Sequence, residues 1–235
     1  MFKFLSVTNI YLFFEKIISF INSIFFIFLA IGLTFALIIL PPDYIQGDSV
    51  RIMYVHVPSA WIALASFSTI TLLSILNYIF KIKNFYLINK SIAPIGLLFT
   101  CLALVTGSFW GQPTWGTWLA WDARLISMLV LMLFYLIYIL SYKIIKTENV
   151  AVNVSSIIAI LGSINLPIIK YSVDWWNTLH QPASINILSK SSIHVSMLYP
   201  LLIMTAAFAL FSLLIFLMKY NTELIKIKNK GLDRL

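Results

Sequence analysis

Six long runs of uncharged, mostly apolar residues constrain the fold of this chain more than any other feature. Each run is roughly 20 residues long, which as an α-helix matches the hydrocarbon thickness of a bilayer. None contains Lys, Arg, Asp or Glu; the runs are Phe20–Leu40, Ala60–Phe80, Ser91–Trp110, Leu125–Tyr142, Val150–Ile169 and Val195–Met218. The sequence therefore predicts an all-α integral membrane protein with six transmembrane helices, forming a single polytopic membrane domain over residues 1–235.

Composition supports this prediction. Only 10% of the residues are charged and 61% are hydrophobic, whereas about a quarter of the residues in a soluble domain are charged. The first run is longer than the apolar region of a signal peptide and has no small-residue cleavage site after it, so we expect it to remain as a span. Cys101, the one cysteine, lies inside the third run, and a lone thiol disfavours disulfide or CxxC chemistry.

The basic residues give the expected orientation. Six spans put both termini on one side, which we call side A and which comprises residues 1–19, 81–90, 143–149 and 219–235. Side A holds twelve of the sixteen basic residues, while on side B four basic residues balance four aspartates. By the positive-inside rule, we expect side A and both termini to be cytoplasmic and side B to face the periplasm or its equivalent. The net positive charge needs no nucleic acid to explain it.

Tryptophan and histidine are confined to side B. Tyrosines occur at both membrane interfaces, as an aromatic belt requires, but all seven tryptophans lie on side B or at the side-B end of a span. They are Trp61, Trp110, Trp115, Trp118, Trp121, Trp175 and Trp176, and the three histidines, His56, His180 and His194, accompany them. A belt explains any single tryptophan, but the one-sided distribution indicates a ligand on side B that contacts aromatic and imidazole groups.

The stretch WGQPTWGTWLAWDARLIS contains the densest tryptophan cluster. Because Pro113 is expected to end the third span, we predict a short interfacial segment between helices 3 and 4. If that segment is helical, the spacing of three between Trp115, Trp118 and Trp121 stacks the indoles on one face. Asp122 and Arg124 follow, close enough to pair or to fix the turn into the fourth span. Such a platform suits a large flat ligand such as haem.

His56 and His180 are the candidate iron ligands. We expect them in the side-B loops 41–58 and 170–193, with nearby backbone carbonyls, or side chains such as Asn177 and Gln181, as hydrogen-bond partners of a bound imidazole. A single histidine at such a position is more often a polar loop residue than a metal ligand. Because both histidines lie on the same side as the indoles, metal ligation is favoured for this pair. His194 opens the sixth span and is left out. Arg51 and Arg124 are the candidate partners of haem propionates, with pairing to side-B aspartates as the alternative.

The same residues resemble a known family. The stretch TGSFWGQPTWGTWLAWDARLIS is similar to the tryptophan-rich "WWD" signature of haem-handling proteins in cytochrome c biogenesis. Within that group, RIMYVHVPSAW and YSVDWWNTLHQPASI resemble the two histidine-bearing loops of the six-span CcmC family. The resemblance runs from about Arg51 through the sixth span.

The resemblance implies a function and a set of partners. It implies binding of haem b at the outer face of the inner membrane and delivery to the periplasmic haem chaperone CcmE, without catalysis. The implied partners are the small subunit CcmD and the ABC-type subunits CcmA and CcmB. It assigns axial ligation, and so the metal site, to His56 and His180. It assigns the platform to Trp115, Trp118, Trp121 and Asp122.

Two other function classes are open on the residues alone. A membrane cytochrome for quinone-linked electron transfer normally ligates haem between histidines inside its spans, and the predicted spans have none at mid-depth. A small-molecule permease tends to carry ionisable residues along its path, and the six runs have none.

Overall fold

The computed structural model of the chain describes residues 7–181 and 193–232, and these are almost entirely helical. In chain order the helices are α1 (Val7–Thr34), the π-helical turn η2 (Phe35–Ile39), the 3-10 helix η3 (Asp48–Ile52), α2 (Met53–Phe80), α3 (Lys83–Trp115), α4 (Ala123–Ile144), α5 (Glu148–Gly162), α6 (Asn165–Trp175) and α7 (Val195–Leu232). Within the described residues, six helical segments are long and apolar enough to cross a membrane. The predicted all-α, six-span architecture is confirmed.

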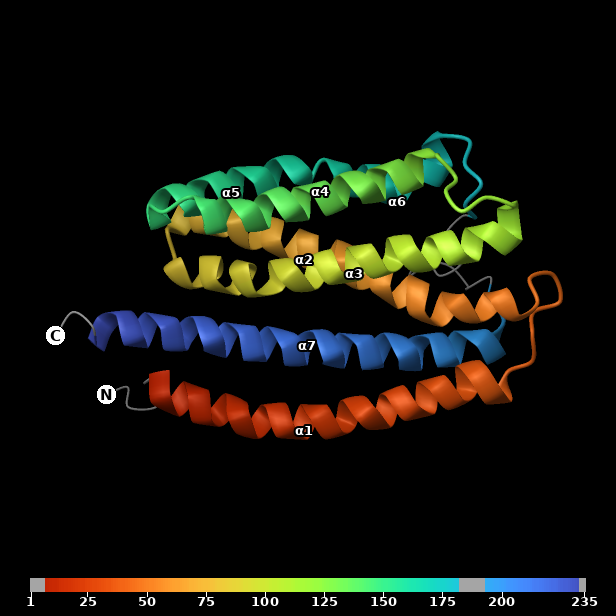
Figure 1. The fold of residues 1–235 in the computed structure, drawn as a ribbon, viewed down its shortest axis with the longest axis horizontal. Coiled ribbons are helices and arrows are strands. Elements are labelled where there is room, and N and C mark those ends of the chain that lie inside the picture. The colour runs from red at the N-terminus through yellow and green to blue at the C-terminus, as the bar shows by residue number, and fades with distance from the viewer. Residues whose placement is uncertain (1–6, 182–192, 233–235) are drawn as a thin grey trace.

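The helices form an elongated bundle with α2 and α3 at its centre (Figure 1). On one side of this pair lies α7, which in turn carries α1; on the other lie α4, α5 and α6. α1 begins and α7 ends at the same end of the bundle, side A, as an even number of spans requires. The connections 43–47, 116–122 and 176–181 gather at the opposite end, side B.

A buried tyrosine joins the three central helices. Tyr135 of α4 is completely buried, and its hydroxyl donates a 2.7 Å hydrogen bond to the carbonyl of Ala63 in α2. Its ring lies where a Cβ would stand on Gly96 of α3, so this position requires glycine. Phe67 of α2 meets the same ring edge-on at 5.0 Å. An aromatic side chain buried with its hydroxyl satisfied stabilises such a core, and here it fixes α4 against α2 and α3.

The fifth span is two helices, with a break at Ser163 and Ile164. Pro167 has no N–H to donate to the carbonyl of Ser163, so the regular hydrogen-bond ladder is interrupted there. The N–H of Leu166 bonds that carbonyl instead, at 3.1 Å, and the side chain of Asn165 donates to the carbonyl of Ser127 in α4 at 2.8 Å. This contact fixes α6 beside α4, so that the chain after Trp175 emerges close to the start of α4.

Two predicted loop boundaries are wrong. Helix begins at Asp48, within the predicted loop 41–58, and α6 extends to Trp175, within the predicted loop 170–193. The prediction ended each span near its charged residues, Arg51 and Lys170. A charged residue limits how deep a helix lies in the membrane, but it does not end the helix, since the backbone bonding continues past it.

The expected break at Pro113 is also wrong. α3 passes through Pro113 and ends at Trp115, because Pro113 falls in the last turn, where its missing N–H removes one bond only. The helix is ended by Gly116, whose φ of +73° places it in the left-handed region and whose N–H bonds the carbonyl of Gln112 at 3.0 Å. Such a glycine is a frequent helix terminator.

Candidate functional site

Two of the three histidines lie against one helix at the side-B end. His56 is in the first turns of α2, and His180 is in the connection that follows α6. Both contact the last turns of α3: His56 beside Thr106 and Gly107, His180 beside Trp115. Gly107 and Trp115 are separated by about 12 Å of helical rise. The structure thus brings together two residues that lie 124 positions apart in the sequence.

The imidazole of His56 is closely surrounded by residues of α3. Its Nδ1 lies 3.1 Å from the hydroxyl of Thr106, and the indole of Trp110 meets the imidazole edge-on at 5.7 Å. A Cβ on Gly107 would stand 2.9 Å from Cε1 of the ring, so only glycine leaves room for it. Contacts on three sides leave this imidazole little freedom to rotate.

His180 is held by a carboxylate. Its Nδ1 lies 2.6 Å from Oδ2 of Asp122, and the ring of Trp115 packs against it at a centroid distance of 4.7 Å. Burial lowers the pKa of His180, and the positive charge of Arg124 lowers it further, while the contact with Asp122 raises it; the net pKa lies below the ordinary value of 6.5. The ring is therefore neutral near pH 7, and Nδ1–H donates to the carboxylate.

Asp122 has a second role at the same place. Its other oxygen, Oδ1, accepts a 2.9 Å hydrogen bond from the backbone N–H of Leu125, which makes Asp122 the N-cap of α4. N-cap aspartates stabilise helix starts by satisfying a free backbone donor. One carboxylate therefore fixes both the entry of the chain into α4 and the orientation of His180.

A glycine at position 111 continues this arrangement along α3. A Cβ there would lie 3.1 Å from Cε3 of Trp115 and 3.2 Å from the carbonyl oxygen of Thr117. Gly107, Gly111 and Trp115 are four residues apart in turn and so lie on one face of the helix. His56 therefore packs against one end of this glycine-containing face of α3, at Gly107, and His180 packs against the other end, at Trp115.

The predicted helical ridge of three indoles is wrong. Trp115 ends α3, whereas Trp118 and Trp121 lie in the non-helical connection 116–122, because Gly116 ends the helix before them. Trp118 packs edge-on against Phe109 at 5.6 Å. Trp121 is 70% exposed. Of the four predicted platform residues, Trp115 and Asp122 contact His180 in the structure, and for Trp118 and Trp121 no histidine contact is seen among the described residues.

The candidate cations have different surroundings. Arg51 bonds Asp48 at 2.8 Å and the carbonyls of Ala36 and Leu40 at 2.6 and 3.1 Å, so it secures the end of the first span. With the described residues, Arg124 makes longer contacts, to the hydroxyl of Ser172 at 3.3 Å and the carbonyl of Gln181 at 3.4 Å. Arg124 is therefore the cation better placed for an anionic group near His180.

Several finer expectations are corrected. Of the two alternatives for Asp122 and Arg124, pairing or fixing the turn into the fourth span, the second holds for Asp122, which caps α4; among the described residues it pairs with His180 and not with Arg124. The side-chain partners of the two imidazoles are Thr106 and Asp122 in place of Asn177 and Gln181, and His56 also meets the backbone carbonyl of Ala103. Thr106, Gly107 and Trp110 were missed as members of the site. No sequence signal links them to His56, since the contact joins segments about fifty residues apart.

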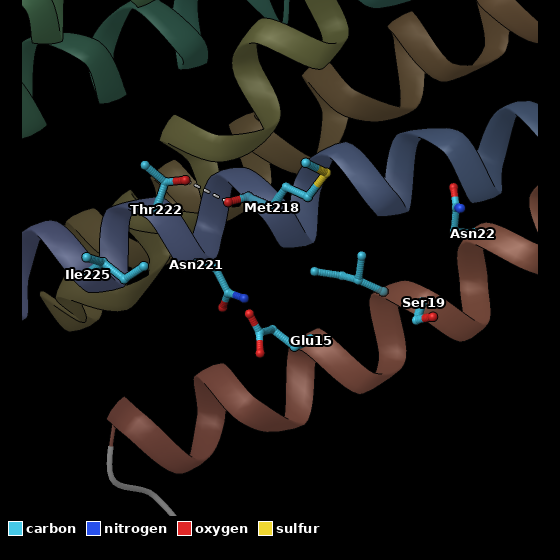
Figure 2. Close-up of a pocket in the computed structure, with 8 residues that line it drawn as sticks. Glu15, Ser19, Asn22, Met218, Asn221, Thr222 and Ile225 are labelled. Atoms are coloured by element: carbon cyan, nitrogen blue, oxygen red, sulfur yellow. Dashed lines mark hydrogen bonds between the residues drawn. The ribbon is translucent and has the colours of Figure 1, made fainter.

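The remaining polar features lie elsewhere. His194 opens α7, where its Nδ1 lies 2.7 Å from the hydroxyl of Ser196. A cavity of about 560 Å³ lies between α1 and α7 toward side A; Figure 2 shows Glu15, Ser19 and Asn221 on its walls. No histidine or tryptophan lines this cavity. Among the described residues, no three or more His, Cys, Asp or Glu side chains are grouped so that they could hold a metal ion.

Comparison with known proteins identifies the family of this chain. The family model of CcmC, Heme exporter protein C, matches residues 1–234. The chain belongs to this family. It is 42% identical to Heme exporter protein C of Bradyrhizobium diazoefficiens over 207 residues, which are 88% of this chain and 78% of that protein. The corresponding protein of Haemophilus influenzae is 41% identical over 200 residues, or 85% of this chain and 81% of that protein.

A third relative extends the comparison to plants. A ccmC-like mitochondrial protein of cytochrome c biosynthesis from Marchantia polymorpha is 44% identical over 179 residues, covering 76% of this chain and 75% of that protein. The resemblance to CcmC is confirmed, and with it a multi-pass membrane protein that handles haem for cytochrome c maturation as a transport component, not as an enzyme. The names of these relatives give no support to the electron-transfer alternative.

Proposed function

We propose that this protein binds haem b between His56 and His180 at the periplasmic face of the inner membrane and delivers it to the chaperone CcmE. The observation that carries the proposal is the pair of histidines at one end of α3, each with Nδ1 bonded to the protein. In each ring Nε2 is then the nitrogen available to iron. A second-nitrogen hydrogen bond of this kind is the usual support of a metal-binding histidine.

The residues around the histidines suit haem as cargo. Trp110 beside His56 and Trp115 beside His180 supply aromatic surface, and Trp118 and Trp121 expose further indole surface on the same end. Arg124, whose hydrogen bonds to the described part of the chain are long, suits a propionate. Arg51 is a poorer candidate, because Asp48 and two carbonyls already occupy its guanidinium.

The proposed location follows from charge. Twelve basic residues lie on side A and four on side B, so we propose that both termini are cytoplasmic and that the histidines face the periplasm. We propose CcmD, CcmA and CcmB as membrane partners, and one membrane domain over residues 1–235. These partners are implied by the family and not by any contact described above.

Haem transfer to the chaperone tests the proposal. The protein is purified in detergent with haem, mixed with the soluble domain of haem-free CcmE, and the two are separated and assayed for haem by absorption. We expect haem to move to CcmE from the wild-type protein, with an His194→Ala variant behaving alike. Purified protein that binds no haem, or haem that stays with it at excess CcmE, would contradict the proposal.

A further inference from the structure

The hydroxyl of Thr106 has a single hydrogen, and the structure shows where it goes. Oγ1 lies 2.7 Å from the carbonyl oxygen of Leu102, one turn earlier in α3, and 3.3 Å from that of Ala103. A carbonyl oxygen can only accept, so at 2.7 Å the hydroxyl donates to Leu102. The oxygen of Thr106 is then left with lone pairs alone for any other partner.

That other partner is His56. Its Nδ1 lies 3.1 Å from Oγ1 of Thr106. Because the hydroxyl hydrogen is already used, this contact requires Nδ1 to carry the hydrogen and to donate it. A neutral imidazole has one N–H and one lone pair, so the lone pair of His56 lies on Nε2. Thr106 thereby selects one of the two tautomers of this ring.

Neighbouring residues make the selection effective. Cε1 of His56 is the atom that a Cβ on Gly107 would strike, and Trp110 meets the ring edge-on. The backbone carbonyl of Ala103 also interacts with this ring, and rotation of the imidazole that exchanged Nδ1 for another atom would break its 3.1 Å contact with Thr106. Side-chain packing and the hydroxyl therefore specify the same orientation.

The two histidines thus have chemically different supports. His180 donates to the carboxylate of Asp122 at 2.6 Å, whereas His56 donates to a neutral hydroxyl at 3.1 Å. A carboxylate partner increases the basicity of a ligating imidazole more than a hydroxyl does. The two rings are therefore inequivalent as ligands.

We propose that Thr106 is a positioning residue that holds His56 in the Nε2-presenting tautomer, and that it makes His56 the less basic of two inequivalent haem ligands. This inference rests on the proposed function. Thr106 does not touch haem; it acts through His56. Loss of such supporting partners typically lowers metal affinity by about 10–100-fold.

Three substitutions and a matched control test the role. Thr106→Val removes the hydroxyl at nearly constant volume, Thr106→Ala removes it with a smaller side chain, and Thr106→Ser retains it. Thr100→Val is the control, because Thr100 lies in the same helix, donates to Gly96 at 2.7 Å in the same way and contacts no histidine. Haem content, the optical spectrum and low-temperature electron paramagnetic resonance are measured on purified protein.

Thr106→Val and Thr106→Ala are expected to lose low-spin six-coordinate haem, with affinity about 10–100-fold lower, and to regain the low-spin spectrum on addition of imidazole. Thr106→Ser and Thr100→Val should keep the wild-type spectrum. If Thr106→Val and Thr106→Ala both keep the wild-type spectrum and haem affinity while His56→Ala loses an axial ligand, this inference is wrong. The proposed function would then still stand. A normal spectrum in His56→Ala would overturn both. If Thr106→Val fails to accumulate, Thr106→Ala against Thr106→Ser decides.

Discussion

Oδ2 of Asp122 lies 2.6 Å from Nδ1 of His180, although 58 residues separate them, and Oδ1 of the same carboxylate caps α4. The start of the fourth span and the orientation of a candidate iron ligand therefore depend on one side chain. Asparagine is as good an N-cap as aspartate, but its amide is neutral. Substitution at Asp122 can consequently separate the two roles.

Asp122→Asn should leave the fold stable while weakening haem binding. The cap persists, but the carboxylate that fixes Nδ1–H is lost, and the amide can donate to Nδ1 and place the hydrogen on Nε2. We expect affinity for haem to fall about 10–100-fold. Asp122→Ala should show the same loss and, in addition, lower stability by about 1 kcal/mol. Haem titration and thermal unfolding measure the two effects; unchanged affinity in Asp122→Asn would mean that the carboxylate serves only the cap.

The tryptophans should now differ from one another. Trp115 contacts His180, whereas Trp121 is 70% exposed and belongs to a connection. Aromatic contacts contribute about 0.5–1.5 kcal/mol beyond burial, or roughly two- to tenfold in affinity. Trp115→Ala should therefore perturb the haem spectrum more than Trp121→Ala. The triple change at positions 115, 118 and 121 should be the most severe. If Trp115→Ala and Trp121→Ala perturb the haem spectrum equally, Trp115 has no special role beside His180.

Acid should weaken haem binding only below the ordinary titration range of histidine. Burial lowers the pKa of His180 below 6.5 despite the opposing contact with Asp122. As the pH falls through 6.5, His180 in the unfolded protein takes up a proton before His180 in the folded protein does. The folded state is therefore most stable above pH 6.5 as far as His180 is concerned, and it loses this stability as the pH falls toward the lower pKa of the folded state. Iron requires the neutral ring, so affinity should follow the same course.

Charge neutralisation provides the check on this pH dependence. Arg124 lowers the pKa of His180, so Arg124→Gln should move the loss of haem binding to higher pH. Lys170→Gln is the control, since Lys170 lies over the ring of Tyr171 and is not among the groups that shift His180. A midpoint that does not move in Arg124→Gln would show that another group governs the loss.

Membrane orientation is tested with reporter fusions. Fusions after residue 232 should be active as cytoplasmic reporters, and fusions within 43–47 or 116–122 should be active as periplasmic ones, because the basic residues are distributed twelve to four. A periplasmic C-terminus would reverse the proposed face of haem binding.

The spans were predictable because apolar length depends on composition alone. The six-helix architecture and the shared end of the histidines follow from uncharged runs and from counting spans. Helix ends were less predictable: the helices continue past Arg51 and Lys170, and the actual ends depend on hydrogen bonding, as Gly116 shows.

The supporting residues of the site could not be predicted. His56 and His180 were identified by type and side, but their partners depend on packing between distant segments. Thr106 and Gly107 contact His56 only because Tyr135 and Gly96 hold α2, α3 and α4 together. Asp122 was assigned to a platform of indoles, since nothing in its local sequence indicates a histidine 58 residues later.

The most direct test is the spectrum of haem bound to three alanine variants. We predict that the wild-type protein binds low-spin, six-coordinate haem, and that His56→Ala and His180→Ala each lose one axial ligand and regain the spectrum with added imidazole. His194→Ala should match the wild type, because His194 bonds Ser196 at the start of α7. A normal low-spin spectrum in both His56→Ala and His180→Ala, with loss of haem in His194→Ala, would contradict the account.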